Sequence, residues 1–237
     1  MGQSFFIWKN IDCRAMGIRL SAPAPIIRPE ERVEHITIPG RSGDLTLLEG
    51  ADIYNSYIQT VTIMAHGSAR MGEIYAWLRG SDYVTFSGEP DKKQAARVIG
   101  AITLNRHAYN LDWWTGEVQF YCQPLKELRN DSNVTITSSG STVMNRGDVV
   151  SKPLFKVTVS GAPLEIAAGG KGFTLTGASI GSTVYIDSES MEAYTGNRTA
   201  MLTSGMTGDF PVLNPGNNTV TGRGWSALEI DRRERFL

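Results

Sequence analysis

Residues 28–44 read Arg28-Pro-Glu-Glu-Arg-Val-Glu-His-Ile-Thr-Ile-Pro-Gly-Arg-Ser-Gly-Asp44. The middle of this stretch alternates between apolar and polar residues, which predicts a strand, and Pro39-Gly40 ends it. Gly40 and Gly43 can adopt positive φ at little cost, so the chain can reverse there. Arg41 and Asp44 lie at this turn, where charges are easily solvated. The stretch predicts a rigid, charged loop presented by a sheet, which suits contact with another protein and offers no catalytic group.

The composition is that of a soluble globular protein. The chain has 237 residues, of which 41% are hydrophobic and 20% charged, and this length is comfortable for two domains. The 25 glycines and the scarcity of helical patterns indicate a mainly β fold. The net charge of −1 gives no basic excess, which argues against a sequence-specific nucleic-acid partner and against an anionic membrane.

The sequence indicates neither a signal peptide, nor a membrane span, nor a disulfide bond. Residues 1–8 lack the basic start and long apolar core of a signal peptide, and no apolar run approaches the roughly 20 residues that span a bilayer. We expect a protein that is made in a cytoplasm and stays soluble there, or leaves by cell lysis. Cys13 and Cys122 are the only two cysteines, and we expect free, structural thiols.

Residues 1–128 are predicted to form an antiparallel β-sandwich with one helix packed against it. Short apolar or alternating runs predict strands at residues 4–7, 18–20, 33–38, 45–48, 57–64, 83–86, 94–102 and 113–122. The strand at 57–64 has apolar residues on both faces, which predicts cover on both sides. Pro124 is expected to end the last strand.

The spacing predicts one helix over residues 69–79. Ser68 can cap its start, and Gly80 can end it in the left-handed conformation. An apolar stripe at i, i+3, i+4 and i+7 is formed by Met71, Ile74, Tyr75 and Leu78. Trp77 flanks this stripe and could widen it. A helix that lies on the sheet explains these residues better than a ligand pocket does.

A second domain is predicted to follow a boundary region. Residues 129–152 are polar and turn-rich, which is typical of a linker, and they contain the first strand of the second domain at 134–137. Residues 153–237 read as all-β. Strands are expected at 154–159, 164–167, 172–176, 183–187, 192–195, 219–221 and 226–231. Short strands at such spacing predict a β-sandwich or jelly roll.

Several motifs occur in an order that resembles a known family. They are Arg28-Pro-Glu-Glu-Arg32, Ile38-Pro-Gly-Arg-Ser-Gly-Asp-Leu45, residues 74–78 before Gly80, Phe86-Ser-Gly-Glu-Pro-Asp91 and Phe120-Tyr-Cys-Gln-Pro124. This series resembles the N-terminal part of the distal tail proteins (Dit family) of long-tailed, siphovirus-type bacteriophages or prophages. Looser motifs at 145–147, 152–153, 184–187 and 210–217 resemble their galectin-like second domain. The chain is short for that family and leaves no room for an inserted carbohydrate-binding module.

The resemblance implies a structural hub at the distal end of a virion tail, assembled in the host cytoplasm. Its N-terminal domain would form a homo-hexameric ring between the tail tube protein and the tail-tip or fibre protein. The tape-measure protein and then the genome would pass through the hole. It implies no catalytic residue, cofactor or metal. Because a closed ring uses a head-to-tail interface, charged loops are candidate contacts, and we single out Arg28, Glu30, Arg41 and Asp44.

Two other functions stay open from the residues alone. A carbohydrate-binding module that contacts the host surface could present Tyr185, Tyr194 or Trp225 to a sugar. An enzyme could use the acidic residues Asp187, Glu189 and Glu192, since paired carboxylates hydrolyse glycosidic bonds when they lie about 5 to 10 Å apart. A solvated acidic hairpin explains the same residues without catalysis.

The remaining motifs favour plain structural explanations. His35, His66 and His107 lie far apart and lack the spacing of a zinc site. Ala168-Gly-Gly-Lys-Gly172 departs from a phosphate loop and predicts a β-turn. Arg146-Gly-Asp148 spells an integrin tripeptide that a turn also explains. The tail Asp231-Arg-Arg-Glu-Arg-Phe-Leu237 is either a docking segment, pairing charges with a neighbour or with the first domain, or a frayed terminus.

Reversing the charge of Arg41 or of Asp44 is predicted to weaken ring assembly, because both side chains lie at the tip of the presented loop. Light scattering of the purified variants measures this directly. An oligomer mass unchanged from that of the starting protein would contradict the prediction.

Overall fold

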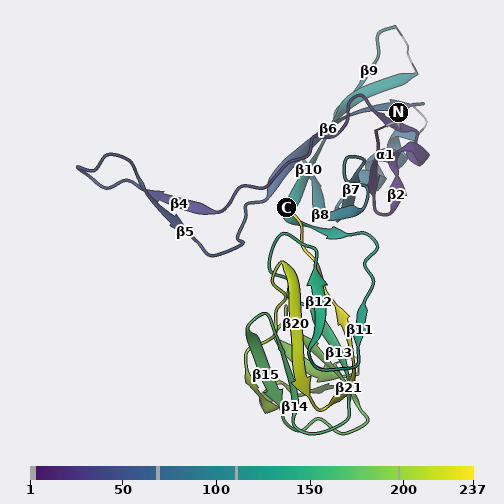
Figure 1. Cartoon of the computed structure of the whole chain (residues 1–237). Helices are drawn as coiled ribbons and strands as arrows, with labels where there is room; N and C mark the ends of the chain where they lie inside the picture. Colours follow the sequence, from purple (N-terminus) through teal and green to yellow (C-terminus); the bar gives the residue numbers. More distant parts are fainter. Residues whose placement is uncertain (1–3, 68–69, 110–111, 197) are drawn as a thin grey trace. The chain divides into compact units, whose positions relative to one another are not determined.

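The computed structural model describes residues 4–67, 70–109, 112–196 and 198–237. The chain divides into two compact units (Figure 1). The first unit comprises residues 1–129 together with Leu237, and the second comprises residues 130–236. Both are built mainly from antiparallel strands, so each is described by itself below.

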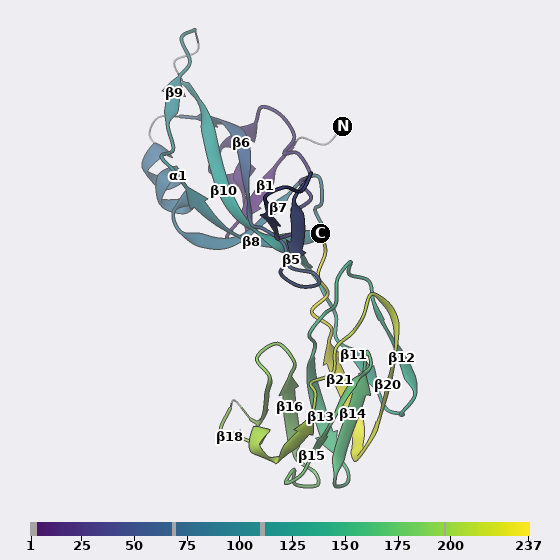
Figure 2. The same ribbon diagram turned by 90° about the vertical axis from the view of Figure 1, so that its left-hand side faces the viewer.

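The first unit contains an eight-stranded antiparallel sheet (Figure 2). Its strands are β1 (Phe6–Trp8), β2 (Ile11–Asp12), β3 (Ile18–Leu20), β6 (Tyr57–His66), β7 (Ser81–Phe86), β8 (Lys92–Ile99), β9 (Leu104–Arg106) and β10 (Trp113–Leu128). They lie in the order β2-β1-β7-β8-β10-β6-β3, with β9 paired to β10. A short 3-10 helix, Cys13–Met16, connects β2 to β3.

This sheet curls until residues from distant strands touch. β7 and β8 separate β1 from β10, which in a flat sheet would leave β1 and β10 about 14 Å apart. The ring of Phe120 in β10 nevertheless lies with its centroid 5.5 Å from that of Phe6 and 5.3 Å from that of Trp8. One face of the sheet therefore closes on itself and forms the core of the unit.

The helix α1 (Met71–Leu78) completes that core. Ile74, Trp77 and Leu78 are buried, and the indoles of Trp8 and Trp77 each donate to the other residue's backbone carbonyl at 3.0 and 3.2 Å. These reciprocal bonds join α1 to β1. Tyr75, placed in the buried stripe by its spacing, is instead 41% exposed, because Trp77 rather than Tyr75 completes the buried side of the helix. The predicted cap Ser68 lies outside the described residues.

Two strand predictions for the first unit are wrong. β6 buries only the face that carries Gln59, Val61, Ile63 and Ala65, and Ile58 on the other face is 49% exposed. β10 does not end at Pro124 but continues to Leu128, with a register shift against β8 between Cys122 and Lys126. Proline lacks an N–H to donate, and such an irregularity is one of the few places in a sheet that tolerates it.

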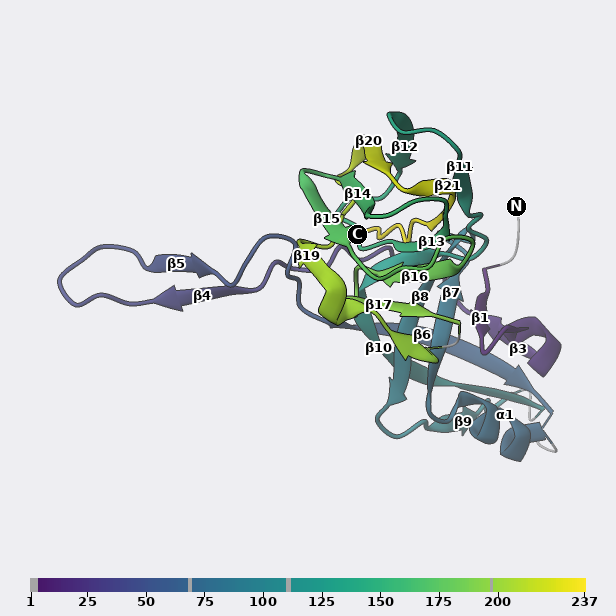
Figure 3. The ribbon, with the colours of Figure 1, turned by 90° about the horizontal axis from the view of Figure 1, so that it is seen from below.

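A third prediction fails at β5. The strands β4 (Val33–Ile36) and β5 (Leu45–Leu48) pair only with each other and form a separate two-stranded sheet (Figure 3). Residues 45–48 therefore do not continue the main sheet. The glycine turn between the two strands returns β5 directly onto β4, with Gly40 at φ +81° and Gly43 at φ +78°.

The second unit is a β-sandwich of two sheets. The first sheet has the order β11-β21-β13-β16-β17-β18, and the second has the order β12-β20-β14-β15-β19. The bounds are β11 (Val134–Ile136), β12 (Ser141–Asn145), β13 (Leu154–Val159), β14 (Leu164–Ala168), β15 (Lys171–Leu175), β16 (Thr183–Asp187), β17 (Glu192–Thr195), β18 (Ala200–Met201), a 3-10 helix Thr203–Gly205, β19 (Met206–Gly208), β20 (Gly216–Arg223) and β21 (Trp225–Asp231). Inward residues of both sheets, among them Phe155, Ile166, Leu175 and Leu228, form one core. The predicted mainly β fold class therefore holds.

The boundary region is more structured than its composition indicates. Residues 130–152 belong to the compact second unit. They supply β11, which pairs with β21, and β12, which pairs with β20. The short strands β2, β9, β12, β18 and β19 were not predicted, since runs of two to five residues carry little periodicity.

The two cysteines are buried and unpaired with each other. Burial raises the pKa of the Cys122 thiol to about 12, so this side chain packs as an apolar group and is a poor nucleophile. Across the described part of the chain, helices of bilayer-spanning length and hydropathy are absent.

Phe120→Ala should destabilise the first unit by about 3 to 5 kcal/mol, because the fully buried ring meets three other aromatic side chains. Urea unfolding followed by tryptophan fluorescence measures the change. Tyr121→Ala is the control, since Tyr121 is the next residue of β10 and is 41% exposed on the other face. Equal losses in both variants would contradict the one-sided core.

Candidate functional site

The hairpin of β4 and β5 forms an arm, defined here as residues 31–54. Its base is closed by an antiparallel bridge between Glu31 and Tyr54, and the Arg32 N–H donates to the Ile53 carbonyl at 2.9 Å. Tyr54 is buried, whereas every residue from 34 to 53 is exposed. The arm is therefore anchored at its base and buries almost nothing of itself within its own unit.

The two faces of the arm differ in chemistry. Cross-strand pairing places Ile36 opposite Leu45 and Glu34 opposite Leu47 on one face. Ile36, Leu45 and Leu47 are 37%, 37% and 43% exposed, and we call them the apolar face. The other face carries the pair Val33 and Leu48 near the base and hydrogen-bonded polar residues toward the tip. There Thr46 Oγ1 lies 3.1 Å from His35 Nδ1, and Thr37 Oγ1 donates to Asp44 Oδ1 at 2.8 Å.

The four predicted contact residues are exposed but do not form one cluster. Arg28 and Glu30 precede the base, whereas Arg41 and Asp44 lie beyond the paired strands, at the tip. The Glu30 carbonyl accepts from the Asn55 N–H at 2.8 Å, so its backbone helps to fix the base. Sequence reasoning missed the apolar face, although it becomes readable once residues 33–36 are paired with 45–48.

The acidic residues of the second unit are held by arginines. Arg233 contacts Asp187 at 2.7 Å and Glu189 at 3.3 Å, while Glu192 pairs with Arg198 at 3.1 Å. Burial alone would raise the pKa of Asp187. Hydrogen bonds from Arg233 and from two backbone N–H groups outweigh burial and lower it. A carboxyl that is ionised and bonded in this way is a poor general acid.

Residues 231–236 of the C-terminal tail belong to the second unit. Glu234 is 1% exposed and binds Arg146 at 2.7 Å and Arg232 at 3.2 Å, and Arg232 also binds Asp131 at 2.7 Å. The tail is therefore not a frayed terminus, and the charges of Arg232 and Glu234 are paired within the second unit. Arg146 of the integrin-like tripeptide is committed to the same network.

The three aromatic residues proposed for sugar binding do not form a platform. Trp225 is 8% exposed and belongs to the core. Tyr185 and Tyr194 lie on the surface but stack on each other, with centroids 5.5 Å apart and planes at 11°. The guanidinium carbon of Arg198 lies 5.3 Å from the Tyr194 centroid. Their rings are largely engaged with each other and with Arg198.

The other motifs take structural roles. The motif at residues 168–172 contains the predicted turn, in which Gly169 and Gly170, both at positive φ, connect β14 to β15. His66 Nε2 lies 2.9 Å from an Asp112 carboxylate oxygen. Within the described ranges, His, Cys, Asp and Glu side chains nowhere gather in a group of three or more that could hold a metal.

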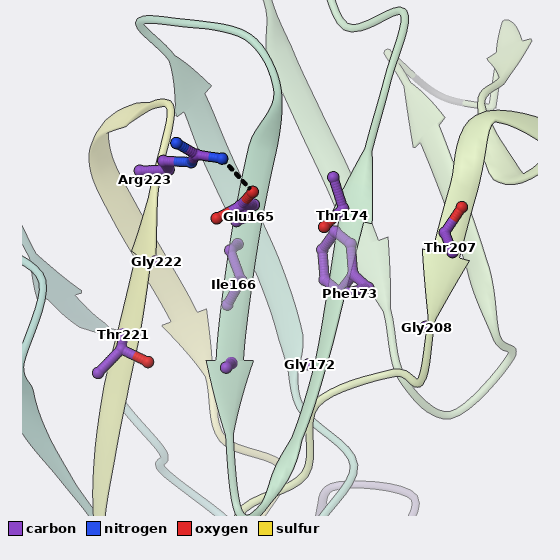
Figure 4. Close-up of a pocket in the computed structure, with 11 residues that line it drawn as sticks. Glu165, Ile166, Gly172, Phe173, Thr174, Thr207, Gly208, Thr221, Gly222 and Arg223 are labelled. Atoms are coloured by element: carbon purple, nitrogen blue, oxygen red, sulfur yellow. Dashed lines mark hydrogen bonds and ion pairs between the residues drawn. The ribbon is translucent and has the colours of Figure 1, made fainter.

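An open hollow of about 550 Å³ lies on the outer face of the five-stranded sheet, across β14, β15, β19 and β20 (Figure 4). At one end Arg223 Nη2 donates to Glu165 Oε1 at 2.7 Å. That hydrogen bond raises the pKa of Arg223. Sequence reasoning missed this feature because its residues come from four separate strands.

The structure was compared with known proteins. It is similar to the crystal structure of the SPP1 Dit protein (gp 19.1), which is described as a paradigm of the hub adsorption apparatus in phages that infect Gram-positive bacteria. The TM-score is 0.78 at 17% sequence identity, and the match covers 100% of both chains. No family model and no curated protein matches the sequence. The similarity establishes a shared fold over the whole length of both chains.

Asp187→Asn should lower the stability of the second unit at neutral pH by roughly 1.5 to 3 kcal/mol, the usual strength of a hydrogen bond to a charged group. The pKa of Asp187 is lowered in the folded state from 3.8. The unfolded chain therefore binds the proton more readily, and this stabilisation is full above pH 3.8 and lost as the pH falls through the folded pKa.

Urea unfolding at neutral pH and below pH 3.8 measures both effects. Glu192→Gln is the control, since its partner Arg198 is 55% exposed. Identical acid-unfolding curves for Asp187→Asn and the unsubstituted protein would contradict the assignment.

Proposed function

We propose that this protein is a structural hub of a phage tail, positioned at the distal end of the virion tail. The observation that carries the proposal is the fold shared with a phage hub protein over the whole of both chains. The ordered motifs from Arg28 to Pro124 support the same assignment independently of the coordinates. The protein acts through shape and without catalysis, in keeping with carboxylates that are already neutralised by arginines.

The hub assembles as a homo-hexameric ring built by the first unit. One side of the ring binds the last tail-tube ring, and the other side binds the tail-tip or fibre protein. The tape-measure protein and the genome pass through its hole. A ring needs two different surfaces on each subunit that fit each other, and Arg28, Glu30, Arg41 and Asp44 contribute to one of them.

The arm supplies the physical reason for self-association. A two-stranded hairpin on its own is at best marginally stable in water, so an ordered hairpin normally packs against something. The apolar face of Ile36, Leu45 and Leu47 remains uncovered within the described part of the chain. In the ring this face packs on the neighbouring subunit, and the charges of Arg41 and Asp44 set the position of the tip.

Native mass spectrometry of the full chain tests the ring. We expect a species of six times the 25.9 kDa chain mass at micromolar concentration. A protein that stays monomeric at every concentration examined would overturn the hub assignment.

The double variant Leu45→Ser, Leu47→Ser should shift the protein from ring to monomer, because burial of each leucine contributes about 1.5 to 3 kcal/mol. His35→Ala, on the opposite face of the same strands, is the matched control and should leave the ring intact. Light scattering over a dilution series separates the variants. A double variant that dissociates at the same concentration as the control would remove the arm from the interface.

A further inference from the structure

The outer face of the eight-stranded sheet carries a row of exposed side chains on three neighbouring strands. Cross-strand pairing places Ile58 of β6 opposite Tyr121 of β10, and Tyr121 opposite Arg97 of β8. Ile58 and Tyr121 are 49% and 41% exposed, and Arg97 is exposed as well. We call these three residues the sheet row. It joins two large apolar or aromatic side chains to one guanidinium.

The apolar face of the arm has the matching composition, because it carries a single charge. Glu34 is exposed and lies opposite Leu47, on the same face as Ile36 and Leu45. Across the described part of the chain, the side chains of Glu34 and Arg97 have no hydrogen-bond or ion-pair partner. These two opposite charges are therefore available to a contact outside the unit.

The charged and apolar groups follow the same order on both surfaces. Adjacent strands lie about 4.8 Å apart, so Arg97 and Ile58, which are two strands apart, are separated by about 10 Å. Along the arm, Glu34 and Ile36 are separated by about 7 Å, with Leu45 opposite Ile36. An arm that crosses the strands of the sheet with Glu34 over Arg97 therefore brings its apolar side chains toward Tyr121 and Ile58.

The arm and the sheet row of one subunit do not cover each other. Every residue of the arm from 34 to 53 is exposed, and so are the three residues of the sheet row. Figure 1 shows the arm extending away from the eight-stranded sheet of its own subunit. In a ring with a head-to-tail interface, each arm and each sheet row is used once. A second copy of the chain therefore satisfies both surfaces at a ratio of one to one.

We propose that the arm of one subunit lies across the sheet row of a second copy, with Glu34 paired to Arg97. The apolar face of the arm then packs on Tyr121 and Ile58. This inference rests on the ring proposed above and names the surface that receives the arm. Tyrosine and arginine are enriched at protein interfaces. The charge pair fixes the register of the contact, since apolar packing alone tolerates sliding whereas a displaced arm would leave both charges unpaired.

Charge reversal tests the contact with the full chain. Glu34→Arg and Arg97→Glu each bring like charges together, so each variant should need at least tenfold more protein to form the ring. The double variant, which carries both changes in one chain, should assemble like the unsubstituted protein. Light scattering over a dilution series measures the concentration at which each protein dissociates.

Mixing the two single variants tests whether the contact runs between subunits. In an alternating ring the Glu34→Arg arm meets the Arg97→Glu sheet at one interface, and the unsubstituted pair meets at the next. An equal mixture should therefore form rings although neither variant does so alone. With one variant labelled with heavy nitrogen, native mass spectrometry should show equal numbers of the two variants in each ring.

Three further variants serve as controls. Asp209→Arg and Lys171→Glu reverse exposed charges of the second unit, and each should leave the dissociation concentration unchanged. Tyr121→Ala should weaken assembly at least tenfold while the melting temperature of the dissociated chain is retained, because the exposed ring is covered only in the ring.

Two results would overturn the inference. One is a pair of single reversals that assemble at the same concentration as the unsubstituted protein. The other is a double variant and an equal mixture that both stay dissociated. In either case rings of the unsubstituted protein would leave the hub function standing without this docking surface. An unsubstituted protein that never assembles would remove both.

Discussion

The one-sided burial of β10 is the constraint on which the first unit depends. Val118, Phe120 and Cys122 are fully buried, whereas the residues between them face solvent. Because β10 pairs with β6, β8 and β9, its inward face sets the inward face of the whole sheet. The curl then brings Phe6 of β1 against Phe120, so one sheet supplies both walls of its own core. The opposite face is left for contacts outside the unit.

Strand positions could be predicted because alternation is a local property of the chain, as at residues 57–64, 113–122 and 154–159. The choice of pairing partner is not local. Nothing within residues 45–48 distinguishes a fifth strand of the sheet from one half of a separate hairpin. Pro124 shows the same limit, since the irregularity that accommodates it is set by the register of β10 against β8.

The candidate sites differ in the same way, because some lie within one stretch of sequence and others depend on strand pairing. The charged tip at Arg41 and Asp44 could be identified because it lies in one continuous stretch. The apolar face needs the pairing of Ile36 with Leu45, and the hollow needs four strands in register. The aromatic residues led to the opposite kind of error, since their residue type suggested a binding surface. Trp225 is of a type that often binds sugars, yet its position in the register of β21 and β13 places it inside the sandwich.

The two units offer surfaces of different physical character. The apolar face of the arm is stabilised by any surface that removes it from water, so shape and the charges around it must provide the specificity. The second unit has already satisfied most of its charges internally, through Arg146, Arg232 and Glu234. What its hollow presents is a neutral set of hydrogen-bonding groups. Such a set exerts little attraction at long range and discriminates only when a ligand's own donors and acceptors match it, since an unmatched polar group loses its hydrogen bonds to water.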